Sequence, residues 1–195
     1  MSVIDFTPIS LDIETSTDTE GTGVILSIGL VDFLSSEAKS YDIRHDVFTI
    51  KPESMRVNQI NILEVDREDR ISLEGADFSL GSWLESFNYP KPFGMNVGTF
   101  DMLFVKKQLP KVASLFGYRS IDLNALIFAE ALKHNVDFRS VKEKLKNGAY
   151  LAVKNKFGGK EHEALFDAYM NCYVLAQILE VYPDWMHGWR SSSAS

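Results

Sequence analysis

Residues 9–15 most restrict what this chain can become, because they alternate strictly between apolar and polar side chains. A period of two is typical of a strand with one face against a core. Asp12 and Glu14 lie together on the polar face, opposite two isoleucines and a leucine. Two carboxylates on one side of an otherwise apolar strand repel each other unless a cation or a proton intervenes. A divalent metal ion with oxygen ligands would resolve this repulsion.

The length of 195 residues suits one domain with a sizeable core. We expect a single domain over residues 1–190 and a disordered tail at 191–195. The sequence shows neither an apolar stretch of membrane-spanning length nor a signal-peptide pattern, so we expect a cytoplasmic protein without a membrane partner. Cys172, the single cysteine, falls among the apolar positions of an expected helix, which indicates a packed thiol.

The charge of the chain is unevenly distributed. Its net value of -7 argues against a protein that coats long nucleic acids. Residues 1–100 hold 7 Lys and Arg against 17 Asp and Glu, whereas residues 101–195 hold 13 against 10. The basic half contains a cluster of lysines: Lys142, Lys144, Lys146, Lys154, Lys156 and Lys160. This cluster is either a solvated face or a rim that attracts phosphate groups, and the sequence favours neither.

The hydropathy pattern predicts an α/β fold in which strands come first. The expected strands cover residues 4–14, 23–34, 41–50, 93–97 and 118–121. The expected helices lie around 55–65, over 77–88, from about 100, over 122–132 with Asp122 as N-cap, from 138, and over 163–181. Gly148, Gly158 and Gly159 are interpreted as a loop. Short links join the first three strands, which favours an antiparallel meander.

Three short motifs contain the acidic residues that are candidates for a functional site. They are Asp12-Ile13-Glu14-Thr15, Asn96-Val97-Gly98-Thr99-Phe100-Asp101 and His162-Glu163-Ala164-Leu165-Phe166-Asp167. Together, and in this order, they resemble the three motifs of the DEDDh (DnaQ-like) superfamily of 3′-5′ exonucleases, and the five-residue step to Asp167 is typical of its histidine subclass. The resemblance implies a ribonuclease H-like fold: a mixed five-stranded sheet, three antiparallel strands first and then two parallel ones, with helices on both faces.

The same resemblance implies a site and a reaction. Two Mg²⁺ or Mn²⁺ ions would lie among the carboxylates, and single-stranded DNA or RNA would be hydrolysed from its 3′ end to nucleoside 5′-monophosphates. Carried over by position, Asp12 would bridge both ions, Glu14 and Asp167 would hold the ion near the nucleophile, and Asp101 would act on the second ion. His162 would be the general base, a role that suits imidazole because it exchanges a proton near neutral pH.

Three further residues are candidates for binding the substrate. The resemblance implies that Thr15 and Asn96 line the nucleotide pocket, while Phe100 is either core packing or a base-stacking platform. The chain departs from the family pattern after Thr15, where residues 16–21 form a polar turn in place of a leucine that wedges between terminal bases. This turn resembles those of small stand-alone exonucleases of phages and bacteria.

Other interpretations remain open at this stage. Singly, Asp101 could be a first-turn acid that favours the helix dipole, Asp167 a solvent-facing residue and His162 an idle loop residue. Their joint occurrence in the required order favours the catalytic interpretation. Two alternative functions are an oligoribonuclease-like enzyme that trims very short RNA and a catalytically inactive module that binds nucleic acid or a partner. Members of the family include monomers and dimers, so a homodimer is one of the expected assemblies.

Overall fold

The computed structural model describes residues 5–61, 63 and 65–186, and within them six strands form one mixed sheet in the order β4-β3-β2-β1-β5-β6. The strands are β1 (Thr7–Thr15), β2 (Ile25–Asp32), β3 (Ala38–Arg44), β4 (Ile71–Ser72), β5 (Pro90–Gly94) and β6 (Ile121–Asp122). The helices are α1 (Pro52–Asn58), α2 (Leu73–Leu84), α3 (Asp101–Gln108), α4 (Pro110–Phe116), α5 (Leu123–His134), α6 (Phe138–Phe157) and α7 (Ala164–Leu179), followed by a 3₁₀ helix, Asp184–Met186.

The sheet has the expected mixed character but one strand more than predicted. β1, β2 and β3 are antiparallel, and β5 and β6 continue the sheet parallel to β1. The prediction of five strands was wrong because β4 adds a sixth, parallel to β3. β4 has two residues, too few to produce an alternating pattern, and its Ser72 also caps α2 by accepting a hydrogen bond from the N–H of Gly75.

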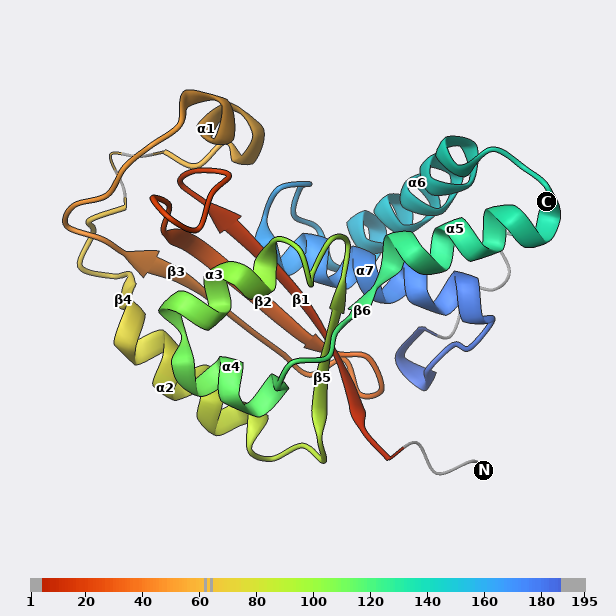
Figure 1. Cartoon of the computed structure of the whole chain (residues 1–195), viewed down its shortest axis with the longest axis horizontal. Coiled ribbons are helices and arrows are strands. Elements are labelled where there is room, and N and C mark those ends of the chain that lie inside the picture. Colours follow the sequence, from red (N-terminus) through yellow and green to blue (C-terminus); the bar gives the residue numbers. More distant parts are fainter. Residues whose placement is uncertain (1–4, 62, 64, 187–195) are drawn as a thin grey trace.

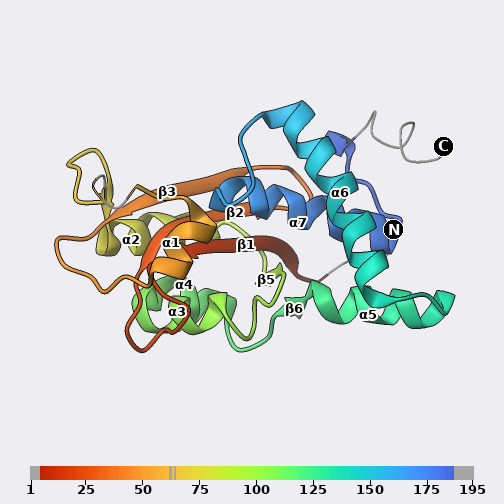
Figure 2. The same ribbon diagram turned by 90° about the horizontal axis from the view of Figure 1, so that it is seen from above.

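Helices cover both faces of the sheet (Figures 1 and 2), with α2, α3 and α4 on one side and α5, α6 and α7 on the other. The alternation of β1 assigns its side chains to these two sides. Ile9, Leu11 and Ile13 are buried in a cluster with α2, α3 and α4. Ser10 lies on the opposite face, where its hydroxyl donates a hydrogen bond to the carbonyl of Ala168 in α7 at 2.7 Å. The polar face of β1 therefore faces α7.

Helix α7 is the most deeply buried helix on that side, and most of its residues belong to the core. Cys172 is fully buried there, which confirms the packed thiol. The predicted N-cap Asp122 is also confirmed, because its side chain accepts a hydrogen bond from the N–H of Asn124 at the start of α5.

Several predicted boundaries were wrong, and the third strand shows why. The expected strand over residues 41–50 is found at Ala38–Arg44, where its first residues pair with β2. The apolar-polar alternation that suggested a longer strand runs on to Val47, whose side chain is 90% exposed. Alternation records neither a hydrogen-bonding partner nor burial, so it continues past the point at which the chain leaves the sheet.

Two further predictions, a loop at Gly148 and a strand at 93–97, were wrong at positions that involve glycine or proline. Gly148 lies inside α6 rather than in a loop, and it packs closely against α7, where a Cβ atom would lie 3.2 Å from Oε1 of Gln177. The strand expected at 93–97 is found at Pro90–Gly94. Its two prolines are tolerated because β6 pairs only with Phe93 and Gly94, so Pro90 and Pro92 need no ladder partner on that side.

Two predicted helices also differ in position. The helix expected over 77–88 begins earlier, at Leu73, and the helix expected around 55–65 is found at Pro52–Asn58. Residues 62 and 64, and the tail predicted at 191–195, lie outside the described residues. In the described part of the chain, no helix combines the length and apolar composition that a bilayer crossing requires.

Candidate active site

The two carboxylates of β1 emerge beside the N-terminus of α7. Asp12 pairs with Gly29 of β2, and Glu14 pairs with Ser27. A Cβ atom on Gly29 would lie 2.5 Å from the carbonyl oxygen of Ala164, the first residue of α7. Only glycine therefore lets the start of this helix lie directly on β2, next to the acidic pair.

The third carboxylate reaches the site from the opposite layer. Asn96 adopts a left-handed backbone conformation with φ 57°, and its carbonyl accepts hydrogen bonds from the N–H groups of Thr99 and Phe100. This turn leads into α3, of which Asp101 is the first residue. The Asp101 carboxylate is 4% exposed, and its Oδ1 accepts a hydrogen bond from the N–H of Ile13 at 3.1 Å. Asp101 is thereby fixed to the strand that carries Asp12 and Glu14.

The histidine and the fourth carboxylate come from the chain that enters α7. Asp167 lies in the first turn of the helix, and its Oδ2 accepts a hydrogen bond from the N–H of His162 at 3.0 Å. His162 has a φ of 66°, a conformation that few residues other than glycine adopt. Its Nδ1 lies 4.0 Å from the same carboxylate oxygen. Asp167 therefore holds the loop that carries the histidine.

These five residues form one cluster. Ligand atoms of Glu14, His162 and Asp167 lie within 4.8 Å of one another. Asp12 belongs to the same group, because the charges of Asp101, Asp167 and Glu14 all act on its carboxyl. The structure thus brings together the residues that the three sequence motifs contributed (Figure 1 shows the end of β1 beside the loop before α7).

The electrostatics of this cluster are those of a site without enough positive charge. Burial, and then the charges of Asp101, Asp167 and Glu14, hold the pKa of Asp12 well above its usual range. Burial, followed by Asp167 and Asp101, raises the pKa of Glu14 to about 8. Burial also raises the pKa of Asp101 to about 7 and that of Asp167 to about 6, although hydrogen bonds from backbone N–H groups oppose both shifts. The carboxylates need either protons or cations to be stable together.

The donor set fits divalent metal ions. Carboxylate oxygens are the ligands that Mg²⁺ and Mn²⁺ prefer. Those of Glu14 and Asp167 lie here beside one imidazole, and Asp12 and Asp101 are near enough for their charges to act on each other. A bound cation would offset the cost of keeping these carboxylates ionised together. The four carboxylates could therefore hold the metal, with His162 beside them.

Two residues that the motifs did not single out line a small pocket of about 100 Å³ together with Asp12 and His162. Lys146 of α6 reaches it and forms an ion pair with Glu161 at 3.2 Å, and its charge lowers the pKa of Asp12. Asn171 is 4% exposed, and its Nδ2 has no hydrogen-bond partner among the described residues. Asn171 lies four residues after Asp167 and therefore on the same side of α7. This spacing is the sequence signal that could have identified it as a residue of the site.

The candidate substrate residues divide into two groups. Thr15 and Phe100 line a second pocket of about 310 Å³ that also borders Glu14 and includes Lys51. Phe100 packs at the same time against Phe104, with ring centroids 5.2 Å apart. The Asn96 side chain instead accepts a hydrogen bond from Nδ2 of Asn124 at 2.8 Å, and Asn96 is not among the residues that line this pocket.

Comparison with solved structures identifies the fold. The zinc-bound complex of E. coli exonuclease I with single-stranded DNA is 13% identical to this chain, with a TM-score of 0.64 over 90% of this chain and 40% of exonuclease I. The complex of E. coli exonuclease I with a dT13 oligonucleotide is also 13% identical, with a TM-score of 0.63 over 89% and 40%. A product-bound structure of exonuclease I is 12% identical, with a TM-score of 0.64 over 93% and 45%.

These likenesses confirm the ribonuclease H-like fold that the sequence motifs implied. The chain spans less than half the length of the exonuclease I chains that it matches. No protein-family model matches the chain, and no curated protein is significantly similar to it in sequence.

Proposed function

We propose that this protein is a divalent-metal-dependent 3′-5′ exonuclease that releases nucleoside 5′-monophosphates from single-stranded DNA or RNA. The observation that carries this proposal is the convergence of four carboxylates and one histidine from β1, α3 and the start of α7. A ribonuclease H-like fold, which the chain shares with exonuclease I, supports the same conclusion. Nothing in folding alone favours so many neighbouring acids.

In this proposal the carboxylates hold two Mg²⁺ or Mn²⁺ ions. Asp12 would serve as a ligand of both, Glu14 and Asp167 would hold the one near the nucleophile, and Asp101 would hold the other. When bound, the metal supplies positive charge that neutralises the scissile phosphate and makes the attacking water more acidic. His162 accepts the proton of that water, and Asp167 keeps the histidine loop in place through the hydrogen bond to its backbone N–H.

The pocket beside Glu14 is the proposed position of the 3′-terminal nucleotide. Thr15, Phe100 and Val57 lie around it, so it offers polar contacts and an aromatic edge, and Lys51 borders it as the ion-pair partner of Asp18. The polar turn at residues 16–21 is held by its own hydrogen bonds, such as that from the N–H of Val24 to the Ser16 hydroxyl at 3.0 Å. A fixed turn of this kind would border the terminal nucleotide without the usual apolar wedge.

The test uses 5′-labelled single-stranded DNA and RNA with Mg²⁺, Mn²⁺ or EDTA. We expect a ladder of shortened products with either metal and none with EDTA or with Asp12→Ala. Products only from strands of a few nucleotides would instead support oligoribonuclease-like trimming, for which the acidic net charge is favourable because short substrates need few phosphate contacts. Binding without shortening, unchanged in Asp12→Ala, would support an inactive binding module.

A further inference from the structure

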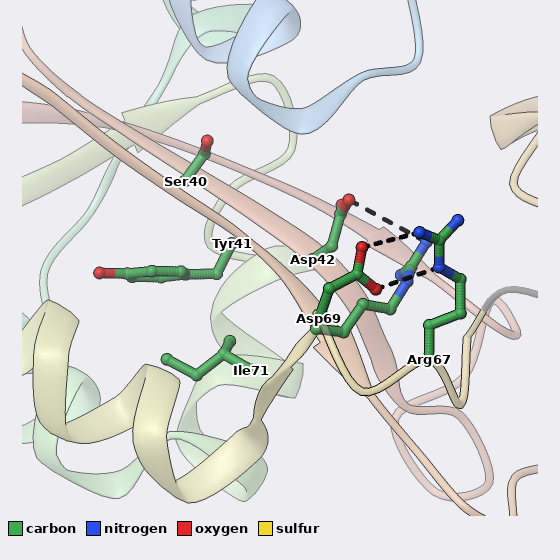
Figure 3. A pocket seen from close by; sticks show the side chains of 7 residues that line it. Ser40, Tyr41, Asp42, Arg67, Asp69 and Ile71 are labelled. Carbon is green, nitrogen blue, oxygen red and sulfur yellow. Dashed lines mark hydrogen bonds and ion pairs between the residues drawn. The ribbon is translucent and has the colours of Figure 1, made fainter.

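A groove extends from the active site across the outer strands of the sheet. Two adjoining cavities of about 580 and 550 Å³ form it, and both are bordered by Asp42 and Arg70. The first cavity reaches His162, and the second ends at Arg67 and Asp69, which Figure 3 shows facing each other above the strand that carries Asp42. The groove therefore joins the histidine of the active site to the loop before β4.

The sheet provides a continuous floor for this groove. Glu14 of β1 pairs with Ser27 of β2, and Ser27 pairs with Asp42 of β3. Paired residues in neighbouring strands project from the same face, so this row leads from the site carboxylates into the groove. Helix α7 begins above the adjacent pair, at Gly29, whereas Ser27 and Asp42 border the first cavity.

Arg70 is the unusual residue of the groove. Its side chain is only 12% exposed, and Nη1 is buried without a hydrogen-bond partner among the described residues. Its Nη2 lies 4.0 Å from Oδ2 of Asp42, which is too long for a hydrogen bond. Arg67, in contrast, donates two hydrogen bonds to Asp69, at 3.1 and 2.8 Å (Figure 3).

A nearly buried guanidinium with an unsatisfied donor is costly, and an anion bound at Nη2, the group that lies toward Asp42, would offset part of that cost. Its planar array of N–H groups matches the oxygens of a phosphate group, which it can bind through two hydrogen bonds. The Asp42 side chain is 66% exposed, so it can turn into solvent and leave Arg70 available to an anion. These features suit Arg70 to binding a phosphate at a fixed place in the groove.

We propose that the groove holds the part of a single-stranded nucleic acid that lies 5′ to the scissile bond, and that Arg70 binds a phosphate of that segment. The proposal rests on the proposed exonuclease function. Ile60 and Leu165 give the groove apolar walls for the bases, and Lys160 adds a positive charge near His162. The terminal nucleotide lies on the other side of the carboxylates, next to Thr15 and Phe100.

Binding is measured with a 5′-fluorescent octathymidylate in Ca²⁺, by fluorescence anisotropy, for the wild type and two arginine variants. We expect Arg70→Gln to raise Kd about tenfold. We also expect it to reduce the slope of log K against log salt by about 0.7, the value for one lost phosphate contact on a single strand. The matched control, Arg67→Gln, removes an arginine already occupied by Asp69 and should change Kd less than twofold.

A second readout separates a phosphate contact from general damage to the protein. The dinucleoside monophosphate TpT has only its scissile phosphate, so Arg70→Gln should leave its kcat/KM unchanged while kcat/KM for the octamer falls about tenfold. An equal fall for both substrates, or no change in either, would overturn the proposal. If Arg70→Gln does not fold, the same comparison is made with Lys160→Gln, a change at an exposed position. We expect it to lower kcat/KM for the octamer about threefold and to leave kcat/KM for TpT unchanged.

These outcomes distinguish the groove from the enzyme function. If the wild type shortens neither substrate but binds the octamer in a manner that depends on Arg70, the exonuclease proposal fails, while binding of a single strand in the groove stands. If it shortens both and neither Arg70→Gln nor Lys160→Gln affects octamer binding, the groove proposal fails and the exonuclease stands.

Discussion

Replacing Glu14 with glutamine should stabilise the metal-free protein at alkaline pH. Burial, then Asp167 and Asp101, raises the pKa of Glu14 from 4.5 to about 8. Between these values the folded protein holds a proton that the unfolded chain has lost, so the free energy of unfolding falls as pH rises through this window. Glutamine has the same shape and no charge, and it removes this penalty.

The magnitude follows from the pKa of Glu14, which lies at about 8 rather than 4.5. Each pKa unit is worth about 1.4 kcal/mol, so ionisation of this side chain costs the folded state at most about 5 kcal/mol. Relaxation of the site and entry of water reduce that value, so we expect Glu14→Gln to raise the free energy of unfolding by about 3 kcal/mol at pH 8.5. The difference at pH 5 should be small.

The assay is urea denaturation in EDTA at pH 5 and pH 8.5, followed by circular dichroism at the helix band. The matched control is Glu37→Gln at an exposed position, which should change stability by less than about 0.5 kcal/mol at either pH. If wild type and Glu14→Gln lose stability equally between the two pH values, the reasoning about the acidic cluster is refuted. A wild type that is more stable at pH 8.5 than at pH 5 would refute it as well.

Three further predictions concern the metal, the histidine and the packing of α7. Mg²⁺ or Mn²⁺ should raise the melting temperature more at pH 8 than at pH 5.5, because protons compete for the carboxylates at lower pH; equal shifts in a thermal-unfolding assay would contradict this. His162→Ala should lower kcat about 100-fold or more with little change in Mn²⁺ affinity by calorimetry, and equal losses of both would contradict the base role. Gly29→Ala should destabilise the protein by about 3 kcal/mol in urea, because its Cβ would lie 2.5 Å from the Ala164 carbonyl; unchanged stability would show that α7 can move away.

The sequence was sufficient for the parts of the fold that follow a local pattern. The alternation around Asp12 and Glu14 correctly assigned both carboxylates to one face of β1, because side chains on a strand must alternate. The cap at Asp122 and the position of Asp101 in a first turn followed from equally local rules. The five site positions could be collected because each lies in a short motif.

What the sequence did not reveal depends on contacts between distant segments. Gly148 was interpreted as a loop residue because the residue that it packs against is distant in the sequence. That residue, Gln177, lies in α7 and not in the helix of Gly148. Lys146 and Asn171 carry no motif, and they join the pocket only through the packing of α6 and α7 onto the sheet. Arg70 is the last of five successive charged residues at 66–70, and only the fold buries its guanidinium in the groove.

The most direct measurement of the proposed function follows a single strand labelled on its 3′-terminal nucleotide. With Mg²⁺ or Mn²⁺, the proposal predicts that the label appears as a nucleoside 5′-monophosphate from the earliest time points, as identified by chromatography against standards. Asp101→Asn, which keeps an oxygen for the hydrogen bond from Ile13 but loses the charge, should fold and release no label. Label that first appears in longer fragments or as a 3′-monophosphate, or release by Asp101→Asn at the wild-type rate, would contradict the account.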